Sequence, residues 1–253
     1  MKKIVYLLIF ISNIAIAQDE KTLPDKGSYN KFLIGLSVSP DLTYRTLLSD
    51  GSSIYLDEII GLRNERESAK LGYTLGLNFN YNFSRKWGLI TGVLYSNKWY
   101  KSELTFGNQI HSRRGFVFDA KPIKNAAIVN DFNYIDIPLK VIYKMGKGKI
   151  RFIGGLGITA NILIDQKQRL ITEYENGDKE KTEFPDYENY NQLNFSPTVS
   201  VGIERKFKSN HVVRVEYNVS HGILGIIDAP ITANLWSSGI NFSYYFGLKK
   251  NLN

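Results

Sequence analysis

Most of this chain alternates apolar and polar side chains one by one, and this feature restricts its fold more than any other. From Lys70 to Phe83 the odd positions are apolar or aromatic, and the even positions are polar or glycine. Successive side chains of a β-strand point to opposite faces, so the pattern predicts a strand with one apolar face. The same alternation recurs from Asn194 to Phe207 and from Val213 to Ser220.

Weaker alternation predicts five further strands, which brings the total to eight. Tilted strands need about 9 to 11 residues to cross a membrane, and these lengths suit such a crossing. Helical spacing is not sustained anywhere after the first seventeen residues, so the mature chain is predicted to be all-β. The five further strands are Lys31 to Leu47, Lys86 to Thr105, Phe132 to Met145, Lys149 to Ile164 or beyond, and Ala233 to Leu248.

The links between the predicted strands alternate strictly between short and long. Three short links, at 84–86, 146–148 and 208–210, have the length of hairpin turns. The other links are longer, at about 48–69, 106–130 and 173–192, with a shorter one near 225–231. Short periplasmic turns and longer external loops are typical of an up-and-down outer-membrane barrel. We therefore predict an eight-stranded antiparallel transmembrane β-barrel located in the cell outer membrane.

The apolar face is predicted to point outward into lipid. Glycines gather on the polar face, at positions such as Gly76, Gly155 and Gly202, and small residues suit the narrow interior of an eight-stranded barrel. Aromatic residues gather near the predicted strand ends, as the girdles of membrane barrels do. Alternation alone also allows a soluble, lipocalin-like ligand carrier with the opposite orientation, and this alternative stays open here.

The first seventeen residues have the features of a secretory signal. Lys2 and Lys3 precede the apolar stretch Ile4 to Ile11, and Ala15-Ile16-Ala17 provides small residues at the expected cleavage site. We expect a cleaved signal peptide at 1–17, a polar periplasmic leader at 18–30 and the barrel domain at 31–253. The chain has no cysteine, which excludes disulfides and thiol chemistry. Its net charge of +8 is scattered without a dense basic run, so nucleic acid is not an expected partner.

Several short motifs resemble those of a known family. They are Tyr134–Lys140 (YIDIPLK), Trp87–Ser96 (WGLITGVLYS), Gly154–Gly157 (GGLG), and Ser39-Pro40-Asp41 followed by Tyr44–Leu47. The chain resembles the Bacteroidota outer-membrane β-barrel family that includes the PorT-like proteins, often labelled "porin family". The resemblance covers nearly the whole mature chain. It implies a barrel in the outer membrane, and some members are linked to protein secretion, but it brings no set of active residues.

Charged residues on the polar face form the candidate site. Opposite charges inside a narrow barrel can pair and fill it, and the alternative is a small selective, porin-like pore. Ser220 and His221 are neighbours on one strand and point to opposite faces, so they do not form a nucleophile and base pair. The predicted lumen charge network consists of Asp136, Lys140, Arg151, Glu204, Arg214 and Glu216.

From these patterns we expect a monomeric, non-enzymatic barrel with a structural or accessory role in the cell envelope and no cofactor. Its expected partners are outer-membrane lipid, lipopolysaccharide and another envelope protein. The small channel and the soluble carrier are the alternative functions.

Overall fold

The computed structural model describes residues 30–104, 123–184, 190–207 and 211–247. The predicted signal peptide, and the leader up to residue 29, lie outside the described residues. In the described part, no helix has the length and apolar character that crossing a membrane requires.

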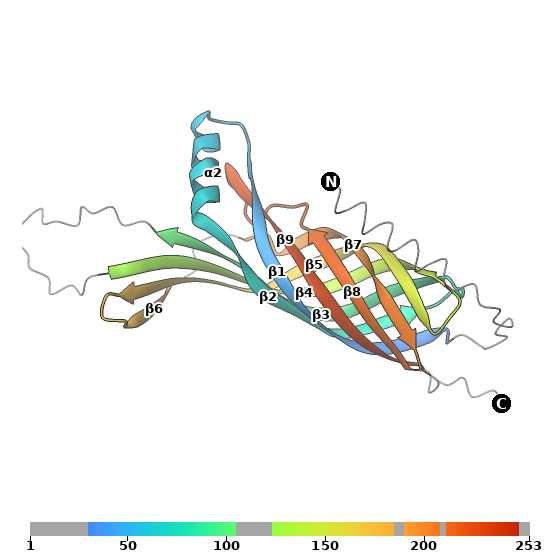
Figure 1. The fold of residues 1–253 in the computed structure, drawn as a ribbon. Coiled ribbons are helices and arrows are strands. Elements are labelled where there is room, and N and C mark those ends of the chain that lie inside the picture. The colour runs from blue at the N-terminus through green and yellow to red at the C-terminus, as the bar shows by residue number, and fades with distance from the viewer. Residues whose placement is uncertain (1–29, 105–122, 185–189, 208–210, 248–253) are drawn as a thin grey trace, which may run out of the picture.

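Eight antiparallel strands close into one barrel (Figure 1). Strands that follow one another around the barrel are hydrogen-bonded neighbours, the last strand pairs with the first, and the predicted fold class is confirmed. The eight strands are β1 (Phe32–Ser49), β2 (Glu67–Tyr81), β3 (Trp87–Leu104), β4 (Ile123–Met145), β5 (Ile150–Tyr174), β7 (Leu193–Lys206), β8 (His211–His221) and β9 (Ile231–Gly247).

The apolar face of the wall points outward, as predicted. Leu77, Val201 and Phe242 are 47%, 59% and 47% exposed, whereas Asn78 and Ser200 are only 5% and 2% exposed. Side chains that would form the core of a soluble protein are therefore on the outside of this barrel, and polar side chains are on the inside. A wall of this kind is stable only where hydrocarbon covers it.

An external arm extends beyond the barrel wall (Figure 1). We use this name for residues 123–132 of β4, 166–174 of β5, and the strand β6 (Lys179–Phe184), which pairs with β5 from Gln168↔Phe184 to Glu173↔Lys179. The sequence predicted loops over most of these residues, and for the described part that prediction is wrong. Alternation fails in the arm because consecutive residues are buried there: Ala126 and Ala127 are 2% and 3% exposed.

A helix, α2 (Tyr55–Arg66), lies between β1 and β2, where the sequence predicted only a loop. The prediction failed because apolar residues lie on two sides of the helix. Leu56 and Ile60 are half-buried toward the barrel, whereas Ile59 and Leu62 are exposed. Two apolar sides cancel the one-sided periodicity by which a surface helix is recognised.

An apolar cluster lies at each end of the lumen. The outer cluster joins inward-facing residues at the external strand ends with Ile226 from the β8–β9 link, and Ile60 of α2 packs against it. A smaller inner cluster of Leu33, Val212 and Tyr245 lies at the opposite end, near the short turns. The outer cluster consists of Leu47, Tyr100, Phe132, Tyr134, Ile226, Ala233 and Leu235.

Candidate functional site

Glu204 is the centre of a buried charge network near the short-turn end of the lumen. Its carboxylate accepts a hydrogen bond from Arg214 Nη2 at 2.9 Å and pairs with Arg151. Lys144 Nζ lies 3.7 Å from the same carboxylate. The side chains of Arg214 and Glu204 are 0% and 1% exposed. Because a buried charge is costly unless it is paired, each of these groups depends on the others.

Neutral side chains satisfy most of the remaining hydrogen-bonding groups around this network. Arg214 Nη2 also donates to Asn80 Oδ1 at 2.9 Å, and its guanidinium lies 4.8 Å from the ring centre of Tyr245. Lys144 Nζ donates to Asn82 Oδ1 at 2.6 Å. The network therefore joins β2, β4, β8 and β9 across the lumen.

Glu216 connects the network around Glu204 to the polar groups one level farther along the lumen, toward the external end. Its carboxylate accepts hydrogen bonds from Lys140 Nζ at 2.8 Å and from Ser200 Oγ at 3.0 Å. Arg214 Nη1 lies 3.8 Å from its other oxygen. The structure thus brings five of the six predicted residues into one connected network: Lys140, Arg151, Glu204, Arg214 and Glu216.

Asp136, the sixth predicted residue, lies apart from the others. It accepts a hydrogen bond from Asn161 Nδ2 at 2.6 Å, and Lys98 Nζ lies 3.8 Å from its other oxygen. Sequence reasoning missed Lys98, and it also missed Asp41, which is 7% exposed in the lumen. Both fall on the inward phase of their strands, so the alternation could have found them.

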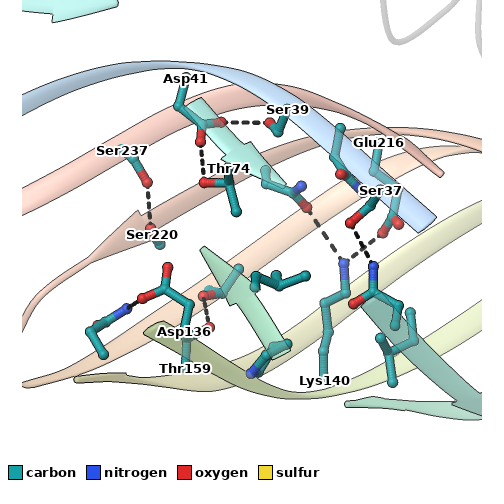
Figure 2. A pocket seen from close by; sticks show the side chains of 18 of the residues that line it. Ser37, Ser39, Asp41, Thr74, Asp136, Lys140, Thr159, Glu216, Ser220 and Ser237 are labelled. Atoms are coloured by element: carbon teal, nitrogen blue, oxygen red, sulfur yellow. Dashed lines mark hydrogen bonds and ion pairs between the residues drawn. The ribbon is translucent and has the colours of Figure 1, made fainter. Parts of the chain in front are cut away.

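A small polar cavity of about 100 Å³ lies between these groups (Figure 2). Hydroxyl and amide side chains form most of its lining, together with Asp41, Asp136 and the Lys140–Glu216 pair. The Asp41 carboxylate accepts hydrogen bonds from the hydroxyls of Ser39 and Thr74, both at 2.5 Å. The charge network packs the lumen on one side of this cavity, and the outer cluster packs it on the other.

Ser220 and His221 do not form a catalytic pair. The Ser220 hydroxyl points into the lumen and hydrogen-bonds Ser237 Oγ at 2.8 Å. His221 is exposed, with Nε2 3.3 Å from Thr46 Oγ1. Among the residues that the structure describes, no group of three or more His, Asp or Glu side chains is placed to hold a metal ion.

An apolar outer wall around a lumen filled with paired charges defines an integral membrane β-barrel. A family model described as "Outer membrane protein beta-barrel domain" matches residues 16–253. The chain belongs to this family, and the protein is located in the outer membrane. The alternative of a soluble, lipocalin-like carrier is therefore wrong, because the apolar side chains face out of the barrel and not into a binding cavity.

Solved structures that are similar to this chain include the following three barrels. Neisserial surface protein A is 11% identical, with 88% of this chain and 100% of that chain covered and a TM-score of 0.45. OprG from Pseudomonas aeruginosa is 15% identical, with 87% and 97% covered and a TM-score of 0.47. Ail of Yersinia pestis is 15% identical, with 85% and 99% covered and a TM-score of 0.32. No curated protein matches the sequence.

Proposed function

We propose that this protein is a non-enzymatic, non-conducting barrel with a structural or accessory role in the outer membrane. The observation that carries the proposal is the buried charge network, in which Glu204, Arg214 and Glu216 cross-link the lumen and are almost fully shielded from water. An eight-stranded interior is only wide enough for side chains to fill it. Paired charges hold those side chains in place and leave no room for an ion with its water shell.

Conductance in planar bilayers tests this proposal directly. We expect the purified protein to give no unitary current in concentrated KCl. A variant with Lys144, Glu204 and Arg214 all replaced by alanine should conduct, because the substitutions empty one level of the lumen. Arg205→Ala, at an exposed position, is the control and should remain silent. A steady unitary current through the unaltered barrel would instead establish the small channel.

The accessory role is assigned to the external arm, which offers another envelope protein a surface outside the membrane. All six residues of β6 are exposed, and within the described residues β6 pairs with β5 alone. Its outer backbone edge is therefore available to a strand of another protein. The addition of a strand to an exposed sheet edge is a recurring mode of recognition. The barrel itself acts as a monomer, surrounded by lipid and lipopolysaccharide.

The proposed partner belongs to a protein-secretion system, and the chain is assigned to the PorT-like branch of Bacteroidota barrels. This part of the proposal is supported by the sequence motifs, such as Tyr134–Lys140, and by the surface that the arm presents. Cross-linking in the native envelope followed by co-purification tests it. A variant in which a short Gly-Ser link replaces residues 168–184 should lose the cross-linked protein and still insert. Retention of every cross-linked protein by that variant would exclude the arm as the docking surface.

A further inference from the structure

Helix α2 carries an apolar stripe that nothing in the described structure covers. Tyr55, Ile59 and Leu62 are 67%, 43% and 47% exposed, and their spacing of four and three residues places them on one side of the helix. Ile54, next to the first residue of the helix, is 84% exposed. Contiguous apolar residues on a surface mark a site of contact with a partner or a membrane.

The other two sides of α2 are of different character. Leu56, Ile60 and Arg63 are half-buried toward the barrel, and Ile60 packs against the outer cluster. The third side is acidic and exposed, with Glu58 and Glu65. The exposed stripe is therefore separate from the side by which the helix packs on its own barrel.

Buried polar contacts hold the helix in a defined orientation. Glu67, the residue after α2, pairs with Arg45 at 2.6 Å and with Arg63 of the helix at 2.7 Å. Arg45 Nη1 donates to Asn64 Oδ1 at 2.5 Å. Arg45 is 2% exposed, so this anchor lies within the barrel mouth. The direction of the apolar stripe is thus set by the barrel.

The end of α2 lies at the level of the external aromatic residues. Tyr44 Oη donates to the backbone carbonyl of Glu67 at 2.8 Å, and the Tyr44 ring meets Trp236 edge-on at 6.0 Å. Aromatic residues of this kind mark the boundary between hydrocarbon and headgroups in membrane barrels. Leu71, shortly after the helix, is 67% exposed on the outer wall. The C-terminal end of α2 therefore lies beside the outer leaflet and not far above it.

Figure 1 shows α2 lying across the long direction of the barrel, with its C-terminal end joined to β2 and its N-terminal end farther from the barrel. A helix across the barrel axis runs roughly along the membrane plane. Leu48, on the outward face of β1 before the helix, is 48% exposed. Leu48 and Leu71 are thus outward-facing apolar residues of the wall that precede and follow α2 in the chain, with short polar stretches between them and the helix.

We propose that α2 is an interfacial helix seated in the outer leaflet, with Tyr55, Ile59 and Leu62 toward the acyl chains and Arg66 among the headgroup phosphates. Lipid is the occupant because the barrel holds the C-terminal end of the helix beside the lipid-covered wall, at the level of Tyr44 and Trp236. The second apolar side of α2, with Leu56 and Ile60, is half-buried, so the surface that α2 leaves exposed has one apolar side and one acidic side. A helix that exposes such a surface lies in the plane of the interface. Its acidic side, with Glu58 and Glu65, faces water.

Spin labels on single cysteines test this proposal, since the chain has no cysteine of its own. Labels at Ile59→Cys and Leu62→Cys are compared with labels at Glu58→Cys and Glu65→Cys, in vesicles of phosphatidylcholine and phosphatidylglycerol. Val201→Cys, on the lipid-facing wall, is the reference for full immersion. We expect the ratio of oxygen to nickel-chelate accessibility to be severalfold higher at positions 59 and 62 than at 58 and 65.

Equal accessibility at all four helix positions would overturn the proposal. So would dipolar broadening at position 59 that disappears when the protein is diluted in lipid, since a second copy would then cover the stripe. Each labelled variant is first checked for the gel shift of a folded barrel, so that misfolding is not mistaken for exposure.

Discussion

At the scale of single residues, the lumen is built from charges that water would normally solvate. Arg214, Glu204 and Glu216 are at most 1% exposed, and each is within 4 Å of an opposite charge. The desolvation of such groups is offset only while their partners are present. The stability of the barrel therefore depends on complete ion pairs more than on any one attractive contact.

Replacing Arg214 by methionine should destabilise the folded barrel by about 3–5 kcal/mol, because Glu204 and Glu216 lose a buried partner. The measurement is urea unfolding in lipid vesicles, followed by tryptophan fluorescence. Arg205→Met is the matched control. Arg205 is exposed, and its guanidinium lies 5.1 Å from the centre of the Phe207 ring, so its loss should cost less than about 1 kcal/mol. An equal decrease in the free energy of unfolding in both variants would contradict the role assigned to the charge network.

Two adjacent glycines should respond differently to alanine. A Cβ atom at Gly155 would lie 2.5 Å from Ser200 Oγ and 3.1 Å from Lys140 Cδ, whereas at Gly154 no atom lies within 4 Å. Gly155→Ala should therefore cost about 1–3 kcal/mol through overpacking. Gly154→Ala should be nearly neutral in the same urea titration. A cost at Gly154 as large as that at Gly155 would show that lumen packing is not the reason for these glycines.

At the scale of elements, the strands of the wall were predictable and the external elements were not. Apolar and polar residues alternate wherever one face of a strand meets lipid and the other meets the lumen. The external arm and α2 are not strands between lipid and the lumen, so their apolar residues are distributed on more than one face. Ala126, Ala127 and Val129 are all buried within one short stretch, which no period of two can describe.

Acid should loosen the external arm without unfolding the barrel. Lys124 Nζ donates to Glu173 Oε1 at 2.8 Å, and this hydrogen bond holds the pKa of the Glu173 carboxyl below its ordinary value of 4.5. Because the pKa of Glu173 is lower in the folded arm than in the unfolded chain, its ionised carboxyl stabilises the arm at pH values above the unfolded-state pKa. This stabilisation is lost as the pH falls through the folded-state pKa. The effect is small because the pair is exposed.

The measurement for the arm is the mobility of a spin label at Thr182→Cys on β6. Mobility should rise as the pH is lowered through and below 4.5. A second substitution, Glu173→Gln, removes the titrating carboxyl and should make the label mobile to the same degree at every pH in that range. The same pH response in both proteins would assign the change to other carboxyl groups.

At the scale of the whole molecule, closure of the sheet satisfies every strand edge of the wall, as hydrocarbon requires. A closed barrel of this kind resists unfolding by detergent at room temperature. Unboiled protein should therefore migrate differently from boiled protein in a detergent gel, and it should require detergent to stay in solution. Identical migration, together with solubility in detergent-free buffer, would be incompatible with a lipid-covered wall.

Much of the site was also predictable, but its connections were not. The alternation placed Arg214 and Glu216 on the inward face because the phase of each strand can be read from its own residues. It could not show that Arg214 reaches Asn80 of β2, a contact between residues far apart in the chain. Nor could it show that Asp136 lies with Lys98 and apart from Glu204, because the stagger between strands sets the level of each side chain.

The eight strands, their outward apolar face and the strict order of short and long links could be derived from the sequence alone, and the barrel follows from them. These follow from local rules, since each strand must satisfy lipid on one side and polar neighbours on the other. The tertiary structure was needed to show which charges pair, which side chains fill each level of the lumen, and how α2 and the external arm are placed. Those features depend on the register between distant strands and on packing beyond the barrel wall, where no simple period constrains the residues.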